Sequence, residues 1–270
     1  VSGGYSVGMW QQTARVAVRS WRLAHRSGAW DLALVVVAYL VYYVVRGMVD
    51  GRAPEAVSRA IRIVELERAL GLFWERQVQG VVLTSQVLVD IFNYIYVYGH
   101  LPLICIVALA MFLFRRPIYV LYRNAFFLAG GIGLLCFTFL PTAPPRLLPW
   151  PYGLVDTVAA FSHISYDSQP AALVNQYAAL PSLHFAWNLL LALAILEATR
   201  NPLLRAVAVM MPLAMAVAIV ATANHFILDI VAGAVVALLG LGLARLWQRQ
   251  GPRLWRRLRR RAVPVSTVAV

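Results

Sequence analysis

The feature of this sequence that most restricts its fold is a series of long apolar runs. A transmembrane helix needs about 20 mainly apolar residues, and six runs approach or exceed that length: 30–45, 84–114, 118–140, 182–198, 203–221 and 226–247. Only 13% of the chain is charged, about half the share that is usual in soluble domains. The sequence therefore predicts an all-α, polytopic membrane protein with six transmembrane helices.

The arginines predict how these helices are oriented. All 24 basic residues are Arg, and 17 of them fall in four segments, 1–29, 115–123, 199–205 and 245–270. Positive residues collect on the cytoplasmic side of a membrane, which places both termini in the cytoplasm. The absence of Lys suggests a bacterial protein, so we expect a multi-pass protein of a bacterial plasma membrane. The arginines at 253–261 indicate contact with anionic lipid headgroups rather than with nucleic acid.

We therefore divide the chain into a basic cytoplasmic segment over 1–29, a membrane catalytic domain over 30–247, and an Arg-rich cytoplasmic tail over 248–270. Within the domain, the segment 54–79 is helix-compatible but far too charged to cross a membrane, because its apolar residues alternate with Arg and Glu. Such a pattern is typical of an amphipathic helix that lies on a membrane surface. We expect this helix on the outer leaflet.

Chemically reactive residues occur in three short segments at the outer ends of the predicted spans: PTAPPR (141–146), NQYAALPSLHFAWN (175–188) and TANHFILD (222–229). In the third segment, His225 and Asp229 are four residues apart and share one helix face. A carboxylate bonded to one imidazole nitrogen leaves the other nitrogen as a nucleophile or base. The alternative is a helix-end Asp beside a surface His.

The other two segments supply groups that suit a phosphate. Ser182 and His184 stand at the start of a predicted span, and helix N-termini present free N–H groups to anions. Arg146 follows two prolines, and a guanidinium held there can bind phosphate with two hydrogen bonds. Taken alone, Ser182 could be an ordinary helix cap and Arg146 an interfacial residue that reaches the headgroups.

Together, these five residues favour phosphoryl transfer through a phosphohistidine. The sequence contains no spacing typical of a structural metal site and no phosphate-binding glycine loop, so we expect no metal and no other cofactor. Further contacts with the substrate or with an acceptor are expected from polar residues near the same face: Asp90, Asn93, Tyr177 and Asn188. His100 lies deeper in its span, where a hydrogen bond between helices is the simpler role.

The motifs also resemble a known family. PSLH, followed about forty residues later by NHFILD, is similar to the second and third motifs of the type-2 phosphatidic acid phosphatase superfamily, usually PSGH and SRxxxxxHxxxD. With PTAPPR and NQYAALPSLHFAW, the chain is more similar to the branch of the inositol phosphoceramide synthases and their bacterial relatives. The resemblance implies that His225 is the nucleophile, Asp229 its partner and His184 the general acid. It implies that Ser182 and Arg146 hold the phosphate.

The sequence departs from the family pattern at four positions. The first motif, KxxxxxxRP, has Phe139 in place of Lys and Leu147 in place of Pro, and Leu183 replaces the Gly of PSGH. Ile219 stands where the third motif has Arg. Two phosphate-binding cations are therefore replaced, and Arg123 lies at the opposite end of its predicted span.

We consider three kinds of function for this sequence. The first is a metal-independent lipid-phosphate phosphatase or phosphotransferase that acts on an isoprenoid or diacyl lipid phosphate at the outer membrane face. Its variant is a headgroup transferase of the inositol phosphoceramide synthase type, with a polyol or sugar as acceptor. The second is a lipid-binding membrane protein without activity, which the replaced cations favour. The third, a transporter, would need an internal repeat, and none is present in the sequence. The oligomeric state is not predicted.

Overall fold

The computed structural model describes residues 52–161 and 176–261, the last eleven of these by their backbone alone, and scattered positions between 28 and 44. The chain separates into two compact units, 1–44 and 45–270. The described positions of the first unit are helical apart from Gly28. In the second unit the described residues form helices, joined by loops that contain one isolated β-bridge, between Thr142 and Ala178.

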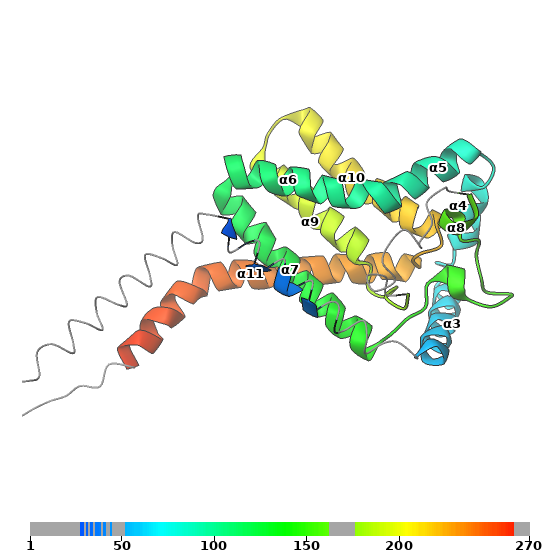
Figure 1. Ribbon diagram of the computed structural model, residues 1–270, viewed down its shortest axis with the longest axis horizontal. Helices are drawn as coiled ribbons and strands as arrows, with labels where there is room; N and C mark the ends of the chain where they lie inside the picture. The colour runs from blue at the N-terminus through cyan, green and yellow to red at the C-terminus, as the bar shows by residue number, and fades with distance from the viewer. Residues whose placement is uncertain are drawn as a thin grey trace, which may run out of the picture. The chain divides into compact units, whose positions relative to one another are not determined.

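Figure 1 shows the helices of the second unit. Most are α-helices; η1 is a π-helix and η2 a single turn of 3-10 helix. Their bounds are α3 Ala53–Ala69, α4 Glu75–Val82, α5 Gln86–Tyr94, η1 Ile95–Gly99, α6 His100–Phe114, α7 Arg116–Phe139, η2 Pro145–Leu147, α8 Thr157–Phe161, α9 Leu183–Ala198, α10 Pro202–Ala221 and α11 Ile227–Arg261.

Four helical segments in the described part of the chain are long and apolar enough to cross a membrane. They are Gln86–Phe114, which joins α5, η1 and α6, then α7, α10 and the part of α11 over Ile227–Gln250. The helix α9 is apolar but has 16 residues, and at about 1.5 Å per residue it is shorter than a typical hydrocarbon core. The expected span over 30–45 lies largely outside the described residues. The all-helical membrane class is therefore confirmed, whereas the count of six spans stays a prediction.

The segment 54–79 differs from the single amphipathic helix that we expected. It forms two helices, because α3 ends before Gly71, whose φ of +69° lies in the left-handed region that terminates helices. The buried face of α3 packs against protein rather than being left open. That contact is formed by Ala56, Ala60 and Val64 from α3 and by Ala143, Leu148 and Phe226 from the loops around the candidate site.

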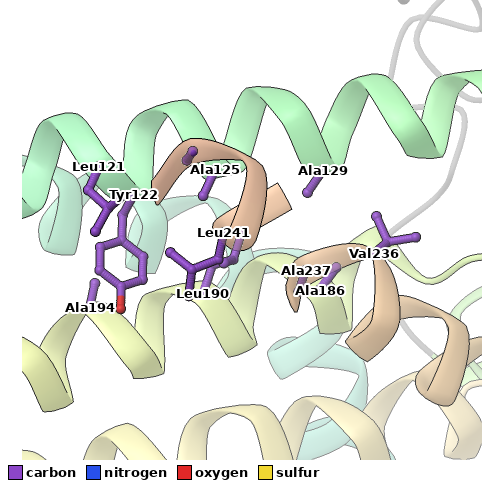
Figure 2. Packing of buried hydrophobic residues seen from close by; sticks show 11 residues of the cluster. Leu121, Tyr122, Ala125, Ala129, Ala186, Leu190, Ala194, Val236, Ala237 and Leu241 are labelled. Carbon is purple, nitrogen blue, oxygen red and sulfur yellow. The ribbon is translucent and has the colours of Figure 1, made fainter. Parts of the chain in front are cut away.

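The central core lies between α7, α9 and α11 (Figure 2). Small residues dominate it, and they allow helix backbones to approach closely where no water drives association. At Gly240 of α11, an added β-carbon would lie 2.8 Å from the carbonyl oxygen of Ala125 in α7. The buried residues of this core are Leu121, Tyr122, Ala125, Ala129, Ala186, Leu190, Ala194, Val236, Ala237, Leu241 and Ala244.

Three helix ends meet beside this core and position the candidate site. α9 begins after Ser182, whose hydroxyl oxygen accepts a hydrogen bond from the N–H of Phe185 at 3.3 Å. α10 ends at Ala221, and α11 begins six residues later, at Ile227, after a tight turn. The N–H of Ser182 donates to the carbonyl oxygen of Asp229 at 3.1 Å, so the start of α9 is bonded directly to the first turn of α11.

Candidate active site

The turn between α10 and α11 holds the imidazole of His225 in one tautomer. The Nδ1 atom of His225 lies 2.8 Å from the carbonyl oxygen of Ala179 and 3.2 Å from Oδ2 of Asp229. A carbonyl oxygen can only accept a hydrogen bond, so Nδ1 carries the hydrogen. In the neutral ring the lone pair is then on Nε2, which is the arrangement that a nucleophilic histidine needs.

Burial and a backbone hydrogen bond hold the side chain of Asp229 in place beside the ring of His225. Its side chain is fully buried, and the oxygen that faces His225 also accepts a hydrogen bond from the N–H of Phe226 at 2.9 Å. The predicted contact between residues four apart is therefore present. A carboxylate in this position stabilises the positive charge that the ring acquires when it attacks phosphorus.

Burial and charge both act on His225, which lies between the two flanking spans. Burial lowers the pKa of His225 to about 4, because a charged imidazolium is poorly solvated inside the protein. The carbonyl of Ala179 acts in the opposite direction, and the positive charge of Arg146 lowers the pKa further. The ring is thus neutral at physiological pH, with the Nε2 lone pair available.

His184 lies among three aromatic rings at the start of α9. Its ring centroid is 5.9 Å from that of His225, 4.7 Å from that of His100 and 4.8 Å from that of Tyr96. Tyr96 belongs to the π-helix η1, and His100 follows it at the start of α6. A π-helical turn inside an α-helix is often found at a functional site. The two predicted histidines are therefore brought together.

Asn188 joins His184 to the third histidine. Its side-chain nitrogen donates to the carbonyl oxygen of His184 at 3.0 Å and lies 2.9 Å from Nδ1 of His100. Because this amide nitrogen is a donor, Nδ1 of His100 accepts, and the neutral ring of His100 carries its hydrogen on Nε2. The expected hydrogen bond of His100 between helices is present, and Asn188 provides it.

Arg146 is held against the turn that carries His225. Its Nε atom donates to Oδ1 of Asn224 at 2.9 Å, and its backbone N–H donates to the carbonyl oxygen of Ala223 at 3.0 Å. The carboxylate of Asp156 lies 3.7 Å from Nε. The guanidinium is therefore held beside the turn that carries His225, and Asp156 partly balances its charge. The binding of phosphate by Arg146 stays a prediction.

The remaining predicted contacts have hydrogen-bond partners of their own. Asn93 is buried and exchanges two hydrogen bonds with Thr157, at 2.9 and 2.7 Å. Asp90 is exposed on α5 and accepts a hydrogen bond from Gln86. The carbonyl oxygen of Tyr177 accepts from the N–H of Thr142. Their roles as substrate or acceptor contacts stay predictions.

The structure shows where the four residues that depart from the family pattern lie. Ile219 is fully buried in an apolar cluster with Met215 and Val220, so no cation occupies that position. Leu183 packs on Gly133 of α7, where an added β-carbon would lie 2.8 Å from the leucine side chain. Phe139 is exposed at the end of α7, and Leu147 packs beside the cluster of α3.

Sequence reasoning missed four residues around the site: Tyr96, Glu67, Glu75 and Asn224. Asn224 directly precedes His225, and this position next to a candidate catalytic residue is the sequence signal that could have identified it. Glu67 and Glu75 are buried although they belong to a segment that reads as charged surface. Among the described residues, no group of three or more His, Cys, Asp or Glu side chains is arranged to hold a metal ion.

The fold and this site define a class of protein, a helical membrane protein in which two histidines and a carboxylate meet at the junction of three helix ends. The sequence model of the PAP2 superfamily matches residues 61–243, and the chain belongs to that superfamily. The superfamily is thus confirmed, while the narrower likeness to inositol phosphoceramide synthases stays a prediction.

The chain is also similar to a solved structure, the crystal structure of Aquifex aeolicus LpxE. The sequences are 18% identical, and the match covers 65% of this chain and 93% of that chain with a TM-score of 0.47. No curated protein matches the sequence.

Proposed function

We propose that the protein is a metal-independent lipid-phosphate phosphatase or phosphotransferase that acts through a phosphohistidine at the extracytoplasmic face of the membrane. The observation that carries the proposal is the tautomer of His225. Its Nδ1 hydrogen is bound by Ala179 and Asp229, so Nε2 is left with its lone pair. Membership of the PAP2 superfamily supports the same chemistry.

In the first step, Nε2 of His225 attacks phosphorus and forms a phosphorus–nitrogen bond. The bond between phosphorus and the lipid oxygen breaks, and its electron pair leaves on that oxygen, which takes a proton from the imidazolium of His184. Arg146 and the N-terminus of α9, capped by Ser182, bind the phosphate oxygens while charge develops on them. Asp229 stabilises the charge on His225.

In the second step, water or an alcohol attacks the phosphohistidine. The attacking oxygen gives its proton to His184, a new phosphorus–oxygen bond forms, and the phosphorus–nitrogen bond breaks to restore His225. With water as acceptor the product is free phosphate; with a polyol or sugar it is a new phosphodiester. The apolar, outward-facing side chains of the spans fit a substrate whose acyl or isoprenoid tail stays in the membrane.

The test is a turnover assay of the detergent-purified chain in the presence of EDTA. The substrates are phosphatidate, polyprenyl phosphates and pyrophosphates and a phosphoinositide, each with and without inositol or glycerol. We expect turnover of at least one lipid, and we expect His225→Ala and His184→Ala each to lower kcat by about two powers of ten or more. Glu65→Gln, on the exposed side of α3, is the control and should retain full activity.

The products separate the two forms of the proposal. Free phosphate identifies a phosphatase, and a new lipid formed only with the polyol identifies a transferase. Acid-labile labelling of the wild type by a phosphorus-labelled substrate, absent from His225→Ala, identifies the intermediate. Wild-type turnover by His225→Ala would overturn the mechanism, and a lack of turnover with every lipid would favour a binding protein.

A further inference from the structure

The start of α11 lacks a helix cap of its own. The residue before the helix is Phe226, whose side chain has no oxygen to accept the free N–H groups of the first turn. Two carboxyl groups from a distant part of the chain take that role. The N–H of Ile227 donates to Glu75 at 2.9 Å, and that of Leu228 donates to Glu67 at 2.7 Å.

Both glutamates are fully buried, with no exposed side-chain surface. One oxygen of each accepts the backbone N–H, and no donor from the described residues reaches the second oxygen, Oε2, of either. The two carboxyl groups are neighbours, because they accept the N–H groups of consecutive residues, Ile227 and Leu228. Two buried carboxylates side by side repel each other, and a proton on one of them removes this repulsion and lets its hydroxyl group donate to the other.

Glu67 is the member of the pair whose pKa is raised. Burial, the hydrogen bond from Glu75 and the negative charges of Glu75 and Asp229 together raise the pKa of Glu67 to about 9, although the bond from the N–H of Leu228 acts against the shift. Asp229, on α11, is the titratable group that faces the pair from the packed helix, and it is bonded to His225.

The same helix turn carries the candidate nucleophile. Three consecutive backbone N–H groups, those of Phe226, Ile227 and Leu228, are bound by Asp229, Glu75 and Glu67 respectively. His225 directly precedes this turn. Any movement of the start of α11 would therefore displace both Asp229 and His225 from the carbonyl of Ala179.

We propose that Glu67 and Glu75 form a proton-sharing carboxyl pair that caps α11 and positions His225 and Asp229 for catalysis. They are positioning residues, because they contact the helix that holds the reacting groups rather than the substrate. The segment that carries them, charged enough to resemble surface, is thus part of the active-site framework. The inference rests on the proposed function for its kinetic test only, since its stability test needs no substrate.

The test compares Glu67→Gln, Glu75→Gln and the double variant, with Glu65→Gln as control. A single Gln keeps the pair satisfied, because its amide oxygen accepts the backbone N–H and its NH2 group donates to the remaining carboxylate. In the double variant both oxygens must accept backbone N–H groups, so two NH2 groups face each other. Because each single variant keeps these hydrogen bonds, we expect it to lower kcat/KM by about threefold at most, and the double variant to lower it by about 30-fold beyond the product of the singles.

The stability test uses the melting temperature in detergent between pH 5 and pH 9. Burial holds the pKa of Glu67 at about 9 in the folded chain, whereas the unfolded chain loses this proton near the ordinary glutamate pKa of 4.5. The stability that the proton contributes is fully present below pH 4.5, and it is lost as the pH rises toward 9. Glu67→Gln has no such proton, so its Tm should fall less over this range than that of Glu65→Gln.

Two outcomes would overturn the inference: equal dependence of Tm on pH in Glu67→Gln and Glu65→Gln, or a double variant that loses no more activity than the product of the singles. A protein that turns over no lipid would contradict the proposed function instead, and the dependence of Tm on pH would still test the pair.

Discussion

At the scale of single residues, Ala223 shows that the site is held in a conformation that its own sequence disfavours. Ala223 has a φ of +56°, in the left-handed region that a residue with a β-carbon enters at a cost of about 1 kcal/mol or more. The turn persists because it is bonded on several sides. Ala223 accepts from the N–H of Arg146, and the N–H groups of Asn224 and His225 both donate to Ile219. This tight turn is what brings Arg146 and His225 together.

Asn224 gives the first prediction at this scale. Asn224→Ala removes the acceptor that holds Nε of Arg146, and a hydrogen bond to a charged group is worth about 1.5 kcal/mol or more. We expect KM for the lipid phosphate to rise about tenfold, because the guanidinium is less well placed to bind phosphate. The measurement is KM and kcat in the turnover assay.

The matched control is Asn124→Ala, which removes the same kind of contact from Arg123 on α7. That pair lies away from the site, and KM should stay at the wild-type value. Equal rises in KM for both variants would show that the effect is not due to the position of Arg146.

The second residue-scale prediction concerns pH. Because burial lowers the pKa of His225 to about 4, the free enzyme keeps a neutral nucleophile well below pH 6.5. We expect this histidine to cause no loss of kcat/KM between pH 7 and pH 5, and a loss only as the pH approaches 4. The check is the dependence of kcat/KM on pH; a half-maximal value near pH 6.5 that is assigned to His225 would contradict it.

The same shift has a consequence for stability. An unfolded histidine takes up a proton near pH 6.5, whereas the folded one does not until about pH 4. The stability that His225 contributes by being neutral is therefore present above pH 6.5 and is lost as the pH falls toward 4. A surface histidine would contribute no such dependence.

At the scale of elements, glycines in α11 decide how closely the helices approach. At Gly233 an added β-carbon would lie 2.5 Å from the carbonyl oxygen of Ser182, which is backbone and cannot rotate away. At Gly242, nine residues along the same helix, nothing lies within 4 Å. The first glycine therefore sets the distance between the start of α9 and α11, and with it the placement of His184 relative to His225.

We predict opposite outcomes for the two substitutions. Gly233→Ala should push Ser182 away from α11, lowering kcat by about tenfold or more and lowering Tm, since overpacking costs about 1–3 kcal/mol. Gly242→Ala should leave activity unchanged and raise stability by up to about 1 kcal/mol, because alanine favours a helix over glycine. Thermal unfolding and the turnover assay on both variants test this, and a neutral Gly233→Ala would contradict the close packing.

At the scale of the whole molecule, one group of arginines lies at the end of the helices opposite to the candidate site. Arg115 donates to the carbonyl oxygen of Ala198, Arg205 donates to that of Leu196, and Arg245 pairs with Glu197 at 3.1 Å. These residues gather where α9 ends, whereas His184 and Ser182 lie where it begins. Which face of the membrane the candidate site occupies stays a prediction.

This orientation can be tested by labelling single cysteines in intact cells. The background is Cys105→Ala with Cys136→Ala, and the probe is a maleimide that does not cross membranes. Trp150→Cys, in the loop beside the site at a position 87% exposed, should be labelled from outside. Arg200→Cys, in the exposed connection between α9 and α10, should be labelled only after the cells are permeabilised. The reverse pattern would invert the topology.

Much of the site could be predicted because its spacing is local. His225 and Asp229 lie four residues apart on one turn, and helix geometry alone brings such residues together. The apolar runs likewise predict spans, since backbone groups in a bilayer must be satisfied within the helix. The amino-acid sequence by itself thus determined the membrane class, the helical architecture and the contact between His225 and Asp229.

Only the tertiary structure decided the contacts between residues that are far apart in the chain. Glu75 and Glu67 bind backbone groups 152 and 161 residues away, and no periodicity in a charged segment distinguishes them from surface glutamates. The same holds for Asn188 and His100, 88 residues apart. Spacing within one helix is set by the backbone, whereas these contacts depend on how separate helices pack, so folding rather than local sequence determines the surroundings of the nucleophile.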